Sequence, residues 1–321
     1  MDSNGGTARP SKKLENKRHG LLYDLFRRLI VEKPLGAFGL LIVIILLLTG
    51  IFANFIAPFG MNEMHLSAFL HPPSSTYWLG TDQMGRDILS RLIYGARVSM
   101  IIGIVATILS EAIAILIGIP SAFIGGKYDM IVQRFVDVWM SMPPFIVLMT
   151  VMSIIGSGMF QLIIVIGITA GIGHSRVIRS AVMGIKSNMY IQASDAIGCG
   201  PIRTMIRHIL PNVMAVIIIS FTLGVGGAIL QEASLSFLGF GVPPGVPSWG
   251  SMLSNEGRQF MEIYPALAFW PGACLTIVVY GINMFGDSVR DLLDPRLRGG
   301  VGRYNLKKKN VQKIKEKLVN V

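Results

Sequence analysis

Long apolar segments restrict the fold of this chain more than any other feature. The first, at residues 35–57, is almost uninterrupted, and five more follow it. A helix needs about 20 predominantly apolar residues to cross the hydrocarbon core of a bilayer. The sequence therefore predicts an all-α, polytopic membrane protein with six transmembrane helices. Their expected positions are residues 35–57, 98–119, 131–155, 158–177, 213–230 and 265–285.

The composition agrees with a chain that lies mostly in lipid. Of the 321 residues 52% are hydrophobic and 15% are charged, and the mean hydropathy is +0.58. A soluble domain of this size needs more charge on its surface. The net charge of +11 falls outside the apolar segments, where membrane topology explains it. A lipid bilayer is therefore the expected partner, and nucleic acid is not.

Prolines mark several expected boundaries of these segments. Pro120 is expected to end the second helix, and Pro211 to separate the fifth helix from the segment before it, because proline removes a helical hydrogen bond. Pro143 and Pro144 interrupt the third segment. They are consistent with ordinary packing or with a bending point used in gating.

The distribution of basic residues predicts the orientation. Residues 1–34 hold eight Lys and Arg, residues 288–321 hold ten, and the segment 174–212 holds five. The segments 58–96 and 239–263 hold few, among several acids. Basic residues favour the cytoplasmic side of a membrane, so both termini are expected in the cytoplasm. An even number of spans agrees with this.

The loop at residues 190–212 is polar, although apolar segments flank it. Gly198 and Gly200 are expected to break a short helix there, since glycine readily takes the left-handed conformation that ends helices. Pro201 can open a second short helix at its first position. The pattern predicts two short helices with a glycine elbow between them. From the residues alone, an amphipathic connector at the membrane surface remains an alternative.

This loop resembles the EAA loop of binding-protein-dependent ABC importer permeases. The similar residues are Gln192-Ala193-Ser194-Asp195-Ala196-Ile197-Gly198 and Ile209-Leu210-Pro211-Asn212. The resemblance implies a coupling helix that docks on an ATPase subunit. The residues assigned to that contact are Gln192, Ala193, Ser194, Asp195, Ala196, Gly198, Pro201, Arg203, Leu210 and Pro211. Gln192 replaces the family's usual Glu, which leaves any salt bridge of that Glu in doubt.

Three further stretches resemble the dipeptide, oligopeptide and nickel permeases. They are residues 79–87 with 94–99, residues 232–239 with 247–250, and residues 294–298. The resemblance implies a type I ABC importer transmembrane fold in the cytoplasmic membrane of a prokaryote. The implied partners are a second, homologous permease forming a heterodimer, two ABC ATPase subunits and an extracytoplasmic substrate-binding protein.

The chain is accordingly divided into an N-terminal appendage and a permease core. The expected parts are a cytoplasmic segment at 1–34, a first helix at 35–57, an extracytoplasmic loop at 58–96, a type-1 permease core at 97–287 and a basic cytoplasmic tail at 288–321. The coupling loop at 190–212 lies within the core.

Four polar or aromatic residues near the expected outer loops are candidate contacts with a partner permease or the binding protein. They are Asp82, Arg86, Asp87 and Trp249. The residues themselves favour a capped turn that leads into a helix, in which Asp82 caps and Arg86 pairs locally.

Charged residues inside or beside the expected spans need polar surroundings. Glu111 lies in mid-span, where a carboxylate costs about 2.5 kcal/mol or more. It is expected either in a buried contact between helices or as a pore-lining group. Arg134 and Asp137 have the spacing of a helical ion pair. Glu232 is expected at a wet outer interface, and His174 at the inner interface.

Motifs for ATP hydrolysis and other catalysis are missing from the sequence. There is no Gly-x-x-x-x-Gly-Lys-[Ser/Thr] loop, no His-Glu-x-x-His and no Gly-x-Ser-x-Gly. The chain is therefore expected to need no cofactor or metal of its own and to take its energy from separate ATPase subunits.

The expected function is the membrane-spanning subunit of an ATP-driven importer of di- or oligopeptides. Nickel-chelate import by the same architecture is an alternative. A second alternative, from a different class of protein, is an ion-coupled secondary transporter. Such proteins usually show internal repeats and paired mid-membrane charges, and no repeat of 20–50 residues is visible here. A structural adaptor would leave the coupling-like loop unexplained.

Overall fold

The computed structural model describes residues 21–293, and the regular elements within them are helices. Five are long. They are α2 (Pro34–Ile51), α4 (Ile88–Ile124), α7 (Met159–Lys186), α10 (Leu210–Phe237) and α13 (Ala266–Leu293). The shorter helices are α1 (Leu21–Glu32), α3 (Ala53–Ile56), η1 (Leu66–Ala68), α5 (Gly126–Ser141), α6 (Pro144–Ile155), α8 (Met189–Ala196), α9 (Pro201–Thr204), η2 (Met205–Ile209), α11 (Trp249–Ser251), η3 (Met252–Gly257) and α12 (Arg258–Phe260).

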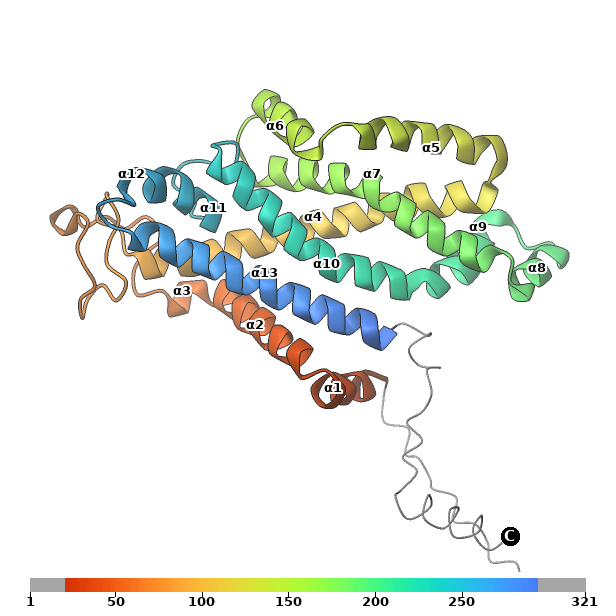
Figure 1. Ribbon diagram of the computed structural model, residues 1–321, viewed down its shortest axis with the longest axis horizontal. Helices are drawn as coiled ribbons and strands as arrows, with labels where there is room; N and C mark the ends of the chain where they lie inside the picture. Colours follow the sequence, from red (N-terminus) through yellow and green to blue (C-terminus); the bar gives the residue numbers. More distant parts are fainter. Residues whose placement is uncertain (1–20, 294–321) are drawn as a thin grey trace, which may run out of the picture.

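The long helices run side by side in an elongated bundle (Figure 1). Helix α4 packs along α7, α10 packs against α4 and α13, and α2 packs against α13 and α4. One end of the bundle carries the irregular segments at 57–87 and 238–265, and we call it the loop end. The opposite end carries α8 and α9, and we call it the elbow end (Figure 1). Both ends of the described chain, at α1 and α13, lie away from the loop end.

The number of candidate spans agrees with the prediction. Five helices are long and apolar enough to cross a membrane, and the bent pair α5 and α6 makes a sixth if it is counted as one span. The expected third span at 131–155 is interrupted at Pro143 and Pro144, as predicted, and its two helices α5 and α6 meet at 84°. Met142 is extended between them, as expected for a residue that precedes a proline, and Pro144 opens α6.

Helix α4 is longer than predicted and contains Pro120. It spans 37 residues from Ile88, where Asp87 caps it, to Gly125, which ends it with φ of 73°. The prediction that Pro120 ends this helix is wrong. A proline inside a membrane helix is tolerated where neighbouring helices support the freed backbone groups, and α4 is packed against α7 there. The expected boundary between residues 96 and 97 falls inside this helix.

Pro211 does not separate α10 from the segment before it. The helix is continuous from Pro201 to Phe237, and its turn at Met205–Ile209 is π-helical. Proline has no N–H to donate and its ring clashes with the carbonyl four residues earlier. The turn just before Pro211 is a wider π turn, in which the N–H of Leu210 bonds to the carbonyl of Met205, so the helix is looser where the ring must fit.

Three buried apolar clusters hold the bundle together. One joins α2, α4, α10 and α13 near the loop end, around Trp249 and Ile229. A second joins α4, α6, α7 and α10. The third lies at the elbow end, where Ile191 of α8 and Ile209 of η2 pack with residues of α4, α7 and α10. The short helices at the elbow end are therefore fixed to the core of the bundle.

Candidate functional site

We call α8, the turn at Gly198 and α9 the elbow, and its base is the part that is buried in the bundle. Ile191 and Ile209 are almost fully buried in the apolar cluster below it. The hydroxyl groups of Ser194 and Thr204, both buried, lie 3.3 Å apart and join α8 to α9. Because η2 and α10 continue directly from α9, any force on the elbow acts on a helix that runs the length of the bundle.

The tip of the elbow is open to solvent. Gly198 has φ of 76°, and no atom lies within 4 Å of the position that a Cβ would occupy there. On either side of it, Ile197 is 79% exposed and Ile202 is 68% exposed. The predicted glycine turn between two short helices is confirmed. The two isoleucines form an exposed apolar surface around it, and that surface is typical of a site that binds another protein.

The residues assigned to the ATPase contact separate into two groups. The exposed ones are Gln192, Ala193, Ala196, Gly198, Pro201, Arg203 and Pro211. Ser194 is buried and Leu210 is half-buried, so Ser194 belongs to the base of the elbow and not to its contact surface. Gln192 donates a hydrogen bond to the carbonyl of Ser187 at 3.2 Å. The side chain of Asp195 lies outside the described part of the chain.

Three of the five basic residues in the segment 174–212 lie on α7. Arg179 donates to both carboxylate oxygens of Asp129, at 2.7 and 2.5 Å. The predicted pair of Arg134 and Asp137 is present at 3.7 Å, and Arg176 also pairs with Asp137. These charges tie α5 to α7, whereas Arg203 at the elbow is exposed.

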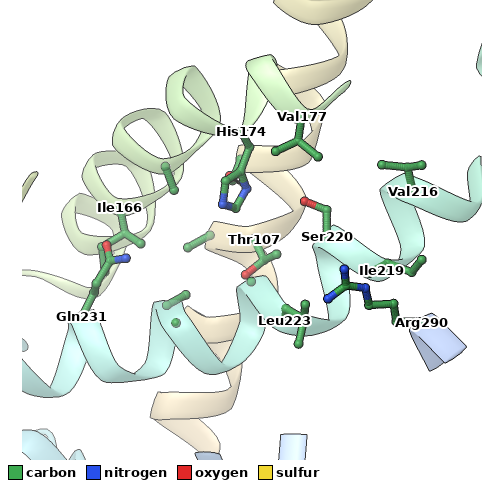
Figure 2. A pocket seen from close by; sticks show the side chains of 16 residues that line it. Thr107, Ile166, His174, Val177, Val216, Ile219, Ser220, Leu223, Gln231 and Arg290 are labelled. Atoms are coloured by element: carbon green, nitrogen blue, oxygen red, sulfur yellow. Dashed lines mark hydrogen bonds between the residues drawn. The ribbon is translucent and has the colours of Figure 1, made fainter. Parts of the chain in front are cut away.

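A groove of about 510 Å³ lies between α4, α7 and α10. Its polar side chains come from all three helices, and Arg290 of α13 reaches it from the side (Figure 2). The polar lining residues are Thr107, Ser110, His174, Ser220, Gln231 and Arg290. The rest of the lining is apolar or glycine, and the part of the chain that the structure describes contributes no carboxylate to it. The groove therefore presents hydrogen-bond donors and cationic or neutral groups.

Glu111 lies behind this groove rather than on its wall. Its side chain is buried, and Oε1 lies 3.4 Å from Nδ1 of His174. His174 is one-third exposed and does line the groove. Glu111 also borders a smaller apolar crevice of about 310 Å³ between α4 and α10. The structure thus places Glu111 in a buried contact between helices. No spacing rule pairs it with His174, because the two residues are far apart in the chain.

The loop end contains a closed polar network centred on Asp82. One of its carboxylate oxygens accepts from the backbone N–H groups of Met84 and Arg86, at 2.8 and 2.9 Å. The other accepts from Nε of Arg86 at 2.6 Å and lies 3.5 Å from Nε of Arg91. The predicted local pairing of Arg86 with Asp82 is confirmed.

The helix cap at the loop end is Asp87, not Asp82. The Asp87 carboxylate accepts from the backbone N–H of Ser90 at 2.8 Å. Trp249 donates from Nε1 to the carbonyl of Leu92 at 3.2 Å. Asp82, Arg86, Asp87 and Trp249 are all at most 5% exposed. Their expected role as outer contacts therefore needs correction, because their polar groups are bound within the chain itself.

Glu232 does not lie at a wet interface. Its side chain is fully buried, and it accepts from Oγ of Ser99 at 3.2 Å and from Oγ of Ser236 at 2.7 Å. The carboxylate joins α4 to α10 at the loop end. The prediction failed because Ser99, on another helix, supplies part of the polar environment that water was expected to supply.

Comparison with known proteins identifies the family. Residues 114–299 match the model of the binding-protein-dependent transport system inner membrane component, and residues 21–73 match that of the N-terminal TM domain of oligopeptide transport permease C. The oligopeptide transport system permease protein OppC of Bacillus subtilis is 36% identical over 92% of this chain and 95% of its own length. The dipeptide transport system permease protein DppC of Haemophilus influenzae is 38% identical over 81% and 90%.

A solved structure agrees with this assignment at the level of the fold. A chain of the MetNI methionine ABC transporter, in an inward-facing conformation, superimposes with a TM-score of 0.53 at 18% identity. The match covers 66% of this chain and 100% of that one. The bundle therefore has the type I ABC importer transmembrane fold. By its family models, its relatives and this fold, the chain belongs to the binding-protein-dependent transport system inner membrane component family.

Proposed function

We propose that this chain carries di- or oligopeptides across the cytoplasmic membrane as one permease subunit of an ATP-driven importer. Two relatives that match this chain over 90% or more of their own length are named for oligopeptide and dipeptide transport. The groove along α4, α7 and α10 supports a translocation role, because it combines an apolar surface with a few polar groups in the middle of long membrane helices.

The elbow is the proposed docking site for an ATPase subunit, and its geometry is the observation that carries this function. Ile197 and Ile202 are exposed around a glycine turn that no described residue covers. The base of the elbow is buried and continues into α10, which lines the groove. Movement of an ATPase bound at the tip would therefore be transmitted to the wall of the groove.

The groove also supports the proposal of a second permease subunit. It is open along one side of this chain, so a closed path for a peptide needs another wall. A homologous permease in a heterodimer would supply it. Two ATPase subunits and an extracytoplasmic binding protein complete the proposed complex. In this arrangement the elbow end faces the cytoplasm, in agreement with exposed Arg203 and Arg207 at that end. Of the predicted basic tail at 288–321, the first six residues belong to α13 and residues 294–321 lie outside the described residues.

The test is to co-purify the ATPase with the permease and to measure peptide uptake in the same cells. Gly198→Asp adds a charged side chain at the tip of the elbow, at a φ that only glycine takes easily. The variant is expected to insert in the membrane normally but to lose most of the bound ATPase and of the uptake. The control is Gly184→Asp, which adds the same charge near the end of α7, where a Cβ also meets no atom within 4 Å.

The control should retain both the bound ATPase and the uptake. If Gly198→Asp also retains both at the level of the unaltered protein, then the elbow is only a connector and the docking proposal is wrong. Transport by the purified chain without any ATPase would contradict the proposed function as a whole.

A further inference from the structure

We infer that His174, held by Glu111, is the group through which the groove contacts the carboxylate of a transported peptide. This inference rests on the proposed function and adds a specificity-determining residue to it. Among the lining side chains, His174 projects from the middle of α7 into the space that α7, α4 and α10 enclose (Figure 2).

The space in front of the imidazole ring is open because the facing residue on α10 is a glycine. Cε1 of His174 lies 3.8 Å from the position that a Cβ of Gly224 would occupy. Nδ1 of the ring faces Oε1 of Glu111 and Oγ of Ser110, each at 3.4 Å. Nε2 is therefore the ring nitrogen that is left for a group in the groove.

The buried carboxylate of Glu111 orients this ring. An isolated carboxylate in the middle of a membrane helix is costly, and neither oxygen of Glu111 has a hydrogen-bond partner among the described residues. The ion-pair partner that the structure gives it is His174. The approach of Nδ1 to this carboxylate orients the ring, so that Nε2 stays available to a group in the groove.

The groove thus offers the imidazole of His174 and the guanidinium of Arg290, and no carboxylate lines it among residues 21–293. Hydrogen bonds are stronger when one partner is ionised. The group of a peptide that fits this lining best is its C-terminal carboxylate. Backbone carbonyl groups also accept hydrogen bonds, but a peptide with an amidated C-terminus has them too. A free carboxylate is therefore what His174 distinguishes.

The test compares uptake of a dipeptide with uptake of its C-terminal amide by the complete complex in proteoliposomes. The same binding protein is used throughout, so that its own preference cancels when variants are compared with the unaltered complex. His174→Leu removes the donor at similar volume. It is expected to lower the carboxylate-to-amide uptake ratio on the order of tenfold. His174→Gln keeps an N–H donor and should retain most of the ratio.

Glu111 is a positioning residue in this scheme, and a second pair of variants tests it. Glu111→Gln can still hydrogen-bond to Nδ1 and should keep the ratio close to that of the unaltered complex. Glu111→Leu leaves the ring without a partner and should lower the ratio in the same direction as His174→Leu. The matched control is Arg176→Leu, which removes a paired charge from the same helix outside the groove and should leave the ratio unchanged.

A purely structural role would lower the uptake of both peptides equally, and that result would overturn the inference. If His174→Leu reduces the amount of assembled complex, the uptake of each peptide is expressed per assembled complex. The resulting ratio is then compared with that of Glu111→Leu. An unchanged ratio in both variants also overturns it. Failure of the unaltered complex to take up either peptide in the presence of ATP would instead contradict the proposed function.

Discussion

Two glycines with similar positive φ angles differ in how closely other residues surround them. Gly85 at the loop end has φ of 70°, and Gly198 at the elbow has φ of 76°. A Cβ at Gly85 would lie 2.6 Å from the carbonyl carbon of His65, whereas a Cβ at Gly198 would meet nothing within 4 Å. Both turns need glycine for the same local reason, but only the first is enclosed by the chain itself.

The polar groups of the two regions differ in the same way. At the loop end Asp82 and Asp87 are buried and bind backbone N–H groups and arginine side chains of the same segment. At the elbow Arg203 is exposed, and the apolar side chains of Ile197 and Ile202 lie in solvent. The loop end forms hydrogen bonds to its own buried polar groups, and these stabilise the fold. The elbow leaves apolar side chains exposed, and these are available to a partner protein.

The largest effect is expected from Asp82→Ala, which breaks the closed network. It removes the carboxylate that pairs with the buried Nε of Arg86, and removal of one partner of a buried ion pair costs about 3–5 kcal/mol. We expect the purified protein to melt at a clearly lower temperature in detergent, or to fail to accumulate in the membrane. A melting temperature within error of that of the unaltered protein would show that the loop end is not held by this network.

Gly85→Ala should have the next largest effect. It adds the strain of a positive φ to a clash with the backbone of His65, together about 2–4 kcal/mol of unfolding free energy. The measurement is the denaturant or thermal midpoint of the purified protein, compared with that of Gly198→Ala.

Gly198→Ala is the variant with which the stability of Gly85→Ala is compared. It carries the same strain without the clash, so it should lower the unfolding free energy by about 1 kcal/mol. If the two alanine variants are equally destabilised, then the surroundings of the two turns do not differ in the way described. Because the added methyl group is small, the Gly198→Ala variant should retain most of the bound ATPase, unlike Gly198→Asp.

Arg134→Ala should have the smallest effect. Its guanidinium lies 3.7 Å from Asp137, but its side chain is 80% exposed, and Asp137 keeps its contact with Arg176. Exposed ion pairs contribute about 0–1 kcal/mol. The melting temperature should therefore stay close to that of the unaltered protein. A loss comparable to that of Asp82→Ala would mean that burial does not separate the two ion pairs.

The sequence was sufficient for features with a local cause. Apolar length predicts the membrane helices, since it depends on the thickness of the bilayer alone. A glycine between two short helices predicts the turn at Gly198, because the left-handed conformation is costly for other residues. The ion pair of Arg134 and Asp137 follows from helical spacing. Each of these properties needs only residues that are close in the chain.

Predictions failed where packing or alternative hydrogen bonds change a local preference. Pro120 lies inside a continuous helix packed along α7, and Pro211 follows a π turn inside a continuous helix. Asp82, with its charge, would be expected at the surface, yet the turn around it buries and satisfies its carboxylate. The penalties assigned from sequence are real, but packing and alternative hydrogen bonds offset them.

The groove and the pair formed by Glu111 and His174 show this limit most clearly. The sequence identifies Glu111 as a costly mid-membrane acid and His174 as a polar residue near a helix end. Their meeting at 3.4 Å depends on the register in which α4 packs against α7. That register is set by the apolar side chains and glycines that fit between the two helices over their whole length. The register thus depends on many weak contacts between residues far apart in the sequence, and no local sequence pattern predicts it.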